Sequence, residues 1–167
     1  APLEMPLKDG SSTSLAVTNN WGEDYLLVKF NKDGEILWAT SIGSKFRENG
    51  TPDVTVGEDG NPVICGVFNA ANGNLTNESE EKREFYIGEQ KYLLYPEQSK
   101  ESALVKLNST DGSVMWSRYF TGTGNQEVLK VQAVSGSNAV AVTGKANNQI
   151  IVEGSAGLST ETVTHVS

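Results

Sequence analysis

Apolar residues lie along this chain in short runs, and a turn sequence borders most of these runs. The run from Tyr25 to Phe30 precedes Asp33-Gly34, and the run from Pro62 to Phe68 follows Asp59-Gly60-Asn61. Glycine provides the positive φ that tight turns require, so an Asp-Gly pair between two β-rich runs predicts a β-hairpin. No segment keeps the apolar period of about 3.6 residues that marks a helix, so the pattern predicts almost no helix.

One segment occurs twice almost intact, which indicates an internal repeat. The first copy reads Tyr25-Leu-Leu-Val-Lys-Phe-Asn-Lys-Asp-Gly-Glu-Ile-Leu-Trp38, and the second reads Ser102-Ala-Leu-Val-Lys-Leu-Asn-Ser-Thr-Asp-Gly-Ser-Val-Met-Trp116. Val28 corresponds to Val105 and Trp38 to Trp116, so the second turn is one residue longer. Beyond this turn the two copies stay in register.

A second hairpin is expected to follow the first in each copy. In the first copy, Val54–Val56 leads through Glu58-Asp-Gly-Asn61 to Pro62–Phe68. In the second copy, Leu129–Val134 leads through Ser135-Gly-Ser-Asn138 to Ala139–Gly144. Two hairpins make one four-stranded blade, so the predicted fold is all-β, with two tandem four-stranded antiparallel blades.

The repeat divides a single region, residues 1–167, into unit one at about residues 20–98 and unit two at about residues 99–155. After the second hairpin the copies differ in length. Copy one has an acidic, Asn-rich stretch and then an apolar one, whereas copy two has a short apolar run and a Ser/Thr/Gly tail. The charged run from Glu78 to Glu84 is predicted to be a solvated surface loop.

The repeated string Leu-Val-Lys-Phe-Asn-x-Asp-Gly-x-Ile-Leu-Trp, with the second hairpin after it, resembles the bacterial seven-bladed β-propeller repeats of secreted and surface proteins. It is also similar to the quinoprotein-type propeller repeat, whose blades carry a glycine four residues before a tryptophan, as Gly34 precedes Trp38 and Gly112 precedes Trp116. The resemblance covers most of residues 20–155. It implies a fold and an extracellular, cell-surface or periplasmic location, but no activity, because propellers host many unrelated functions.

Two blades cannot close a propeller ring, because closed rings have ~4 to 8 blades. An open pair of blades leaves apolar faces in water, which is a liability for association. Further blades in the same polypeptide, or other chains, are therefore expected to cover these open faces.

Charge restricts the partners of the chain. Thirteen basic and 21 acidic side chains give a net charge of -8, which repels phosphate backbones and anionic lipid headgroups. No run of ~18 apolar residues could span a bilayer. The expected partners therefore include neither nucleic acid nor an inserted membrane. Cys65, the single cysteine, lies among Val63, Ile64 and Val67 and is predicted to be a buried structural thiol.

Trp38 and Trp116 hold the same place in the two copies and are predicted to pack one blade against the next, because an indole ring contributes a large apolar area. Trp21 lies outside the repeated segment, in the turn-like Asn19-Asn-Trp-Gly22. It is therefore the candidate binding residue, as an exposed contact for a partner.

No residue is assigned a catalytic or metal-binding role, and no cofactor is expected. His165, the single histidine, lies in a polar tail, and one histidine with one cysteine cannot form a Cys/His metal cluster. Asp33, Glu35, Glu58 and Asp59 could offer oxygen ligands to calcium but are predicted to be solvated turn residues. No local spacing singles out a carboxylate pair for glycoside cleavage.

The leading functional hypothesis is a non-catalytic extracellular or cell-surface module that binds a protein or glycan partner through propeller loops. One alternative is an enzyme on a propeller scaffold, either a glycosidase with paired carboxylates or a quinone-dependent oxidoreductase. Another alternative is a structural subunit of a surface assembly.

Overall fold

Strands are the only regular elements in the part of the chain that the structure describes. In a computed structural model, these residues are 3–6, 10–15, 24–44, 50–68, 84–93, 100–122, 124–147, 150–154 and 161–163. They form fourteen strands and no helix, which confirms the prediction of an all-β chain. The strands are β1 (Leu3–Pro6), β2 (Ser12–Leu15), β3 (Tyr25–Phe30), β4 (Ile36–Ser44), β5 (Asp53–Val56), β6 (Pro62–Phe68), β7 (Glu84–Ile87), β8 (Gln90–Leu93), β9 (Glu101–Leu107), β10 (Val114–Thr121), β11 (Gln126–Ala133), β12 (Val140–Ala146), β13 (Ile150–Gly154) and β14 (Glu161–Val163).

The predicted hairpins β3–β4, β5–β6, β9–β10 and β11–β12 are all present. Gly34 at φ 82° and Gly112 at φ 75° take the left-handed conformation in the first turn of each copy. Asn31 Oδ1 stabilises its turn by accepting hydrogen bonds of 2.9 Å from the backbone N–H groups of Asp33 and Glu35. Asn108 Oδ1 accepts the corresponding bond of 2.9 Å from Thr110 N–H. The repeat in sequence is therefore a repeat in turn chemistry.

A third hairpin completes each copy, β7–β8 in the first and β13–β14 in the second. It pairs with the second strand of the first hairpin, so β7 lies beside β4 and β13 beside β10. The register is the same in both copies, since Ile42 lies opposite Ile87 and Phe120 lies opposite Val152. The repeat therefore has three hairpins.

The two hairpins that were expected to share one blade lie in different sheets, so the predicted grouping into two four-stranded blades is wrong. Strand β6 pairs with β9 of the second copy, which gives a six-stranded central sheet in the order β14-β13-β10-β9-β6-β5. Strands β3, β4, β7 and β8 form a separate four-stranded sheet. The reason is that β7 occupies the edge of β4 that β5 would need.

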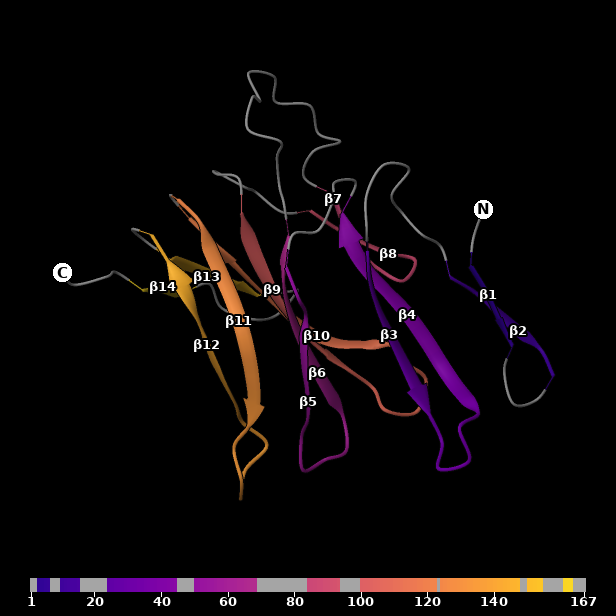
Figure 1. Ribbon diagram of the computed structural model, residues 1–167. Coiled ribbons are helices and arrows are strands. Elements are labelled where there is room, and N and C mark those ends of the chain that lie inside the picture. Colours follow the sequence, from indigo (N-terminus) through magenta and orange to yellow (C-terminus); the bar gives the residue numbers. More distant parts are fainter. Residues whose placement is uncertain are drawn as a thin grey trace.

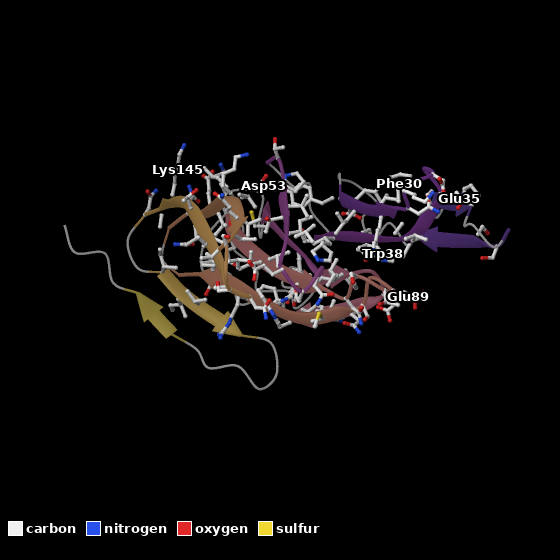
Figure 2. The ribbon with its side chains drawn as sticks, turned by 90° about the horizontal axis from the view of Figure 1, so that it is seen from below. Phe30, Glu35, Trp38, Asp53, Glu89 and Lys145 are labelled. Atoms are coloured by element: carbon white, nitrogen blue, oxygen red, sulfur yellow. The ribbon has the colours of Figure 1, made fainter. Side chains whose placement is uncertain are left out.

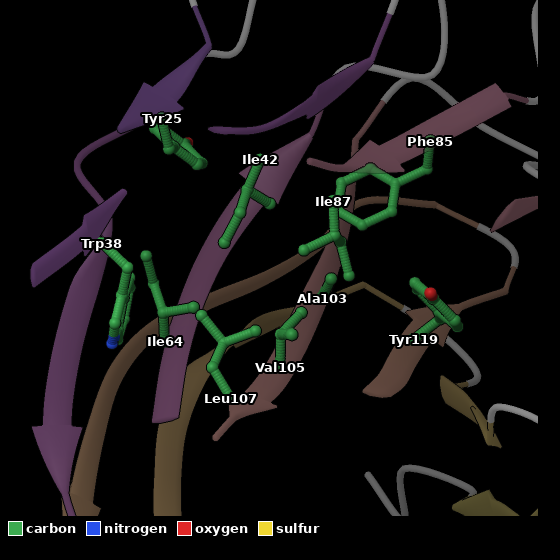
Figure 3. Close-up of a cluster of buried hydrophobic side chains, with 10 residues drawn as sticks. All are labelled: Tyr25, Trp38, Ile42, Ile64, Phe85, Ile87, Ala103, Val105, Leu107 and Tyr119. Carbon is green, nitrogen blue, oxygen red and sulfur yellow. The ribbon is translucent and has the colours of Figure 1, made fainter. Parts of the chain in front are cut away.

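The central sheet is covered on both faces (Figure 1), by the β3-β4-β7-β8 sheet on one side and by the β11–β12 hairpin on the other. Side chains of β9 alternate between the two layers. Ala103, Val105 and Leu107 face the cluster shared with the four-stranded sheet (Figure 3), whereas Leu104 faces the cluster shared with β11. All seven residues of β9 are buried as a result.

No helix in the described part of the chain is long and apolar enough to cross a membrane.

Candidate functional site

The joint between the two copies centres on Trp38. This side chain is 6% exposed, and its Nε1 donates a hydrogen bond of 3.0 Å to the backbone oxygen of Ser109, in the β9–β10 turn. Lys29 Nζ donates to the same oxygen. Gly112 lies beneath the indole ring, where a Cβ atom would come within 2.8 Å of Trp38 Cε3. The tryptophan of one copy therefore packs on the Asp-Gly turn of the next.

Strand β9 is also bound to the β5–β6 turn by polar contacts. Lys106 Nζ lies 2.6 Å from Asp59 Oδ2, and Asn61 Oδ1 accepts a hydrogen bond of 2.9 Å from Ser109 N–H. The hydrogen bond from Lys106, together with those from Asn61, lowers the pKa of Asp59 to about 2. Asp59 is thus an exposed turn residue, as predicted, whose carboxylate also binds the neighbouring strand.

Hairpin β11–β12 is held against β5 by side-chain acceptors on the first copy. Asp53 Oδ2 accepts a hydrogen bond of 2.9 Å from Val131 N–H, and Thr55 Oγ1 accepts one of 3.1 Å from Ala133 N–H. The bond from Val131 N–H is the main reason that the pKa of Asp53 is lowered. These bonds use backbone donors of β11 that its own hairpin leaves open.

Apolar side chains of two strands in different sheets are wholly or partly exposed on the first copy, Leu26, Val28 and Phe30 on β3 and Val54 and Val56 on β5, and we call these five residues together the apolar face. Leu26 is 49% exposed, Phe30 54% and Val54 49%. Figure 2 shows Phe30 and Trp38 on opposite sides of the β3–β4 hairpin, as alternation along the strands requires.

Four of the five counterparts of this face in the second copy are buried. Ala103, Val105 and Leu107 correspond to Leu26, Val28 and Phe30 and are at most 1% exposed. Val131 corresponds to Val54 by its distance from the hairpin turn and is 5% exposed. The same positions are therefore an interface in one copy and open in the other.

Among the edge strands in the described part of the chain, β3 and β12 hold corresponding places in the repeat. Strand β3 ends the four-stranded sheet, and β12 ends the two-stranded sheet that it forms with β11. In the first copy, the counterpart of β12 is β6, and β6 pairs with β9, which is the counterpart of β3. An edge strand offers a row of backbone donors and acceptors, which is a template for another strand.

A pocket of about 200 Å³ opens beside β12, between this strand and β10 and β13. Its apolar lining is Phe120, Val128, Val142 and Ile150, with Gly144 at its wall. In the first copy, the corresponding place is filled by Tyr25, whose ring lies over Gly66 and whose hydroxyl donates 2.8 Å to Val67 O.

Ser102 replaces Tyr25 in the second copy and is too small to fill this place. Ser102 is buried, and its hydroxyl donates a hydrogen bond of 2.8 Å to the backbone oxygen of Gln126. This large-to-small change between the copies therefore contributes to the pocket.

The structure places the candidate residues from the sequence in different environments. Trp21, the candidate binding residue, and His165 lie outside the described residues. Trp38 packs between layers as predicted, and Cys65 is 1% exposed, which confirms a buried thiol. Trp116 is half-buried and packs against the second apolar cluster.

The acidic turn residues are not gathered into a metal site. Glu58 accepts a hydrogen bond from Gly136 N–H, and Asn31 Nδ2 donates one of 2.6 Å to Glu35 Oε2. Within the described ranges, no group of three or more His, Cys, Asp or Glu side chains could hold a metal ion.

The apolar face was not found in the sequence, although a signal was present. Leu26 is larger than its counterpart Ala103, and Phe30 is larger than its counterpart Leu107. Both residues alternate along β3 with Leu27 and Lys29. A β-strand with apolar residues on both faces is expected to be covered on both faces.

Comparison of the chain with protein families, with curated proteins and with solved structures finds no match.

Proposed function

We propose that this chain is a non-catalytic repeat module of a β-propeller-like protein, located at the cell surface or outside the cell, and that it binds a protein partner through the apolar face. The observation that carries the proposal is the contrast between Leu26, Phe30 and Val54, which are about half exposed, and their buried counterparts in the second copy. Exposed apolar residues gathered on one face of a soluble protein are typical of an interaction surface.

The propeller part of the proposal is supported by the stacking of antiparallel sheets and by the repeated hairpin order. In a propeller, each blade packs its face on the next blade. The central sheet packs in this manner on both sides, through Trp38 on one face and Leu104 on the other. The location is supported only by the resemblance of the repeated segment to surface propeller repeats.

A glycan partner is the weaker alternative. Sugar rings stack on exposed aromatic side chains, and Trp38 is closed to a ligand because it is 6% exposed. The glycan alternative therefore depends on Trp21, outside the described residues, and on the half-buried Trp116.

Binding of immobilised chain to surface-protein extracts and to a glycan array would test this function. Leu37 is 41% exposed, and its counterpart Met115 is 50% exposed, so Leu37 lies outside the apolar face and provides the matched control. We expect a captured protein to be lost with Phe30→Lys and retained with Leu37→Lys. The proposal would be contradicted if the chain bound nothing in the extracts or on the array, or if Phe30→Lys left the capture of a protein unchanged.

A further inference from the structure

We propose that the partner of the apolar face is a second molecule of this chain. The two molecules are joined head to tail, by pairing of β12 in one molecule with β3 in the other. This inference rests on the proposed function, because it names the occupant of the same face. Its basis is continuity with the joint that the structure already contains, in which β6 pairs with β9.

The internal joint gives the register of the pairing. Ile64 lies opposite Val105 in the β6–β9 ladder. Val142 corresponds to Ile64, and Val28 corresponds to Val105. The equivalent pairing therefore places Val142 of one copy opposite Val28 of the next and builds a six-stranded sheet like the central one.

The apolar face would be buried by this pairing. In the internal joint, Val105 and Leu107 lie in one cluster with Trp38 and Ile42. In the second repeat, the side chains that correspond to Trp38 and Ile42 are Trp116 and Phe120, which are both half-buried. Leu26, Val28 and Phe30 of the incoming copy would cover them.

Hairpin β11–β12 would cover the rest of the face. In the internal joint, Val63 and Cys65 of the β5–β6 hairpin pack on Val131. By correspondence, the β11–β12 hairpin of one molecule would lie over Val54 and Val56 of the next molecule. The pocket beside β12 is the space that Leu26 and Val28 of the incoming strand would enter.

The seat for the second tryptophan is also present and open. Trp38 rests on the turn that contains Gly112, and Gly34 is the counterpart of that glycine. No atom lies within 4 Å of a Cβ placed at Gly34. Trp116 of one copy would rest on this turn of the next, with Lys32 O as the counterpart of Ser109 O.

The carboxylate contacts that Asp53 and Asp59 make in the internal joint have no counterpart, because Lys130 holds the place of Asp53, and this gives the association a distinct salt dependence. The turn of β11–β12 has Ser135-Gly-Ser-Asn138 and no carboxylate in the place of Asp59. The proposed joint between two molecules is therefore apolar, while each molecule carries a net charge of -8. Added salt screens the repulsion between copies, so association should be kept or strengthened in 0.5 M NaCl.

The first experiment measures the mass of the purified chain by light scattering over a range of concentrations. We expect the mass to rise from 17.9 kDa to two or more times this value, because a heterologous contact can extend or close into a ring. Leu26→Lys with Phe30→Lys should hold the mass at 17.9 kDa, whereas Leu37→Lys should not. Circular dichroism of each variant checks that the fold is kept.

The second experiment tests the register and the head-to-tail geometry. A Val28→Cys protein and a Val142→Cys protein are treated with a short thiol cross-linker, alone and mixed; Cys65 is buried in both. Covalent dimers should form only in the mixture. An Ala141→Cys protein, whose new side chain lies on the other face of β12, should not replace Val142→Cys.

A chain that stays at 17.9 kDa at high concentration overturns this inference, as does cross-linking of either cysteine variant to itself. Binding to a surface-extract protein that depends on Phe30, together with a monomeric purified chain, would refute the second copy as partner and leave the proposed function standing. Self-association that Leu37→Lys abolishes as well would also contradict the proposed geometry.

Discussion

Trp38 Nε1 donates a hydrogen bond of 3.0 Å to the backbone oxygen of Ser109, across 71 residues of sequence. This bond joins the first hairpin of one copy to the first turn of the next. The indole ring contributes apolar contacts on the same site, as a member of the cluster that contains Ile64 and Leu107. The relationship between Trp38 and Ser109 therefore defines how successive repeats are stacked.

Trp38→Ala is expected to lower the free energy of unfolding by ~3–5 kcal/mol, the usual range for emptying a large aromatic core site. Trp116→Ala should cost less, because Trp116 is half-buried whereas Trp38 is 6% exposed. Urea denaturation of both variants measures the difference. Equal losses of stability would show that the two tryptophans are packed alike, contrary to the structure.

Gly112→Ala is expected to destabilise the protein more than Gly34→Ala. Both glycines have φ near 80°, which costs an alanine ~1–2 kcal/mol. Only at Gly112 would the added Cβ meet Trp38, at 2.8 Å from Cε3. The additional loss should be ~1–3 kcal/mol, the range for overpacking.

Gly34→Ala thus serves as the control for backbone strain in this comparison. Thermal melts at a protein concentration that keeps both variants monomeric would measure the two losses. The packing of Trp38 on the β9–β10 turn would be refuted if the two substitutions lowered the melting temperature equally.

Acid should weaken the β6–β9 joint below about pH 4. The pKa of Asp59 is lowered from 3.8 to about 2, chiefly because Lys106 donates a hydrogen bond to the carboxylate. The folded state therefore favours the ionised carboxylate, and its stabilisation is present above pH 3.8 and is lost as the pH falls toward 2. Urea midpoints at pH 7, 4, 3 and 2 would follow this loss.

Lys106→Met tests the cause of that pH dependence, because methionine keeps much of the apolar length of the lysine side chain. Without the lysine, the pKa of Asp59 should rise toward 3.8 and the acid loss between pH 4 and pH 2 should shrink. Asp59→Asn should shrink it as well. An unchanged acid profile in both variants would assign the effect to other carboxylates.

Cys65 is expected to resist alkylation in the folded protein at pH 8. Burial raises the pKa of its thiol to about 11, and the side chain is 1% exposed, so little thiolate is present and access is closed. Iodoacetamide labelling followed by mass spectrometry should give full modification in urea and almost none without it. Rapid labelling of the native chain would show that the layer between β6 and β11 opens.

The hairpins could be predicted from the sequence because each is defined locally. Gly34, Gly60, Gly112 and Gly136 take positive φ in the four predicted turns. The hairpin β7–β8 was not recognised, although Gly88 and Glu89 separate two short apolar runs there. Turn chemistry acts over a few residues, and this is the range in which sequence patterns are informative.

The order of strands in the sheets could not be predicted, because it depends on competition between distant edges. Strands β7 and β5 both follow β4, and only the folded chain shows that Ile42 of β4 lies opposite Ile87 of β7. The pairing of β6 with β9 follows from that choice. The apolar residues of β3 show in the sequence, but their exposure could not be predicted for the same reason, because the strand order decides that Ala103 is covered and Leu26 is open.

The shared central sheet also has a consequence for how such repeats can be exchanged. A cut between residues 98 and 99, where the sequence divides the two units, would separate β6 from β9 and split six hydrogen-bonded strands into incomplete pieces. Neither fragment would keep the ladder from Val63–Lys106 to Phe68–Glu101. A cut before β5 would keep β6 with β9 but would separate β7 from β4, so neither boundary leaves every sheet intact, and exchange of one repeat requires its neighbours to supply the missing strands.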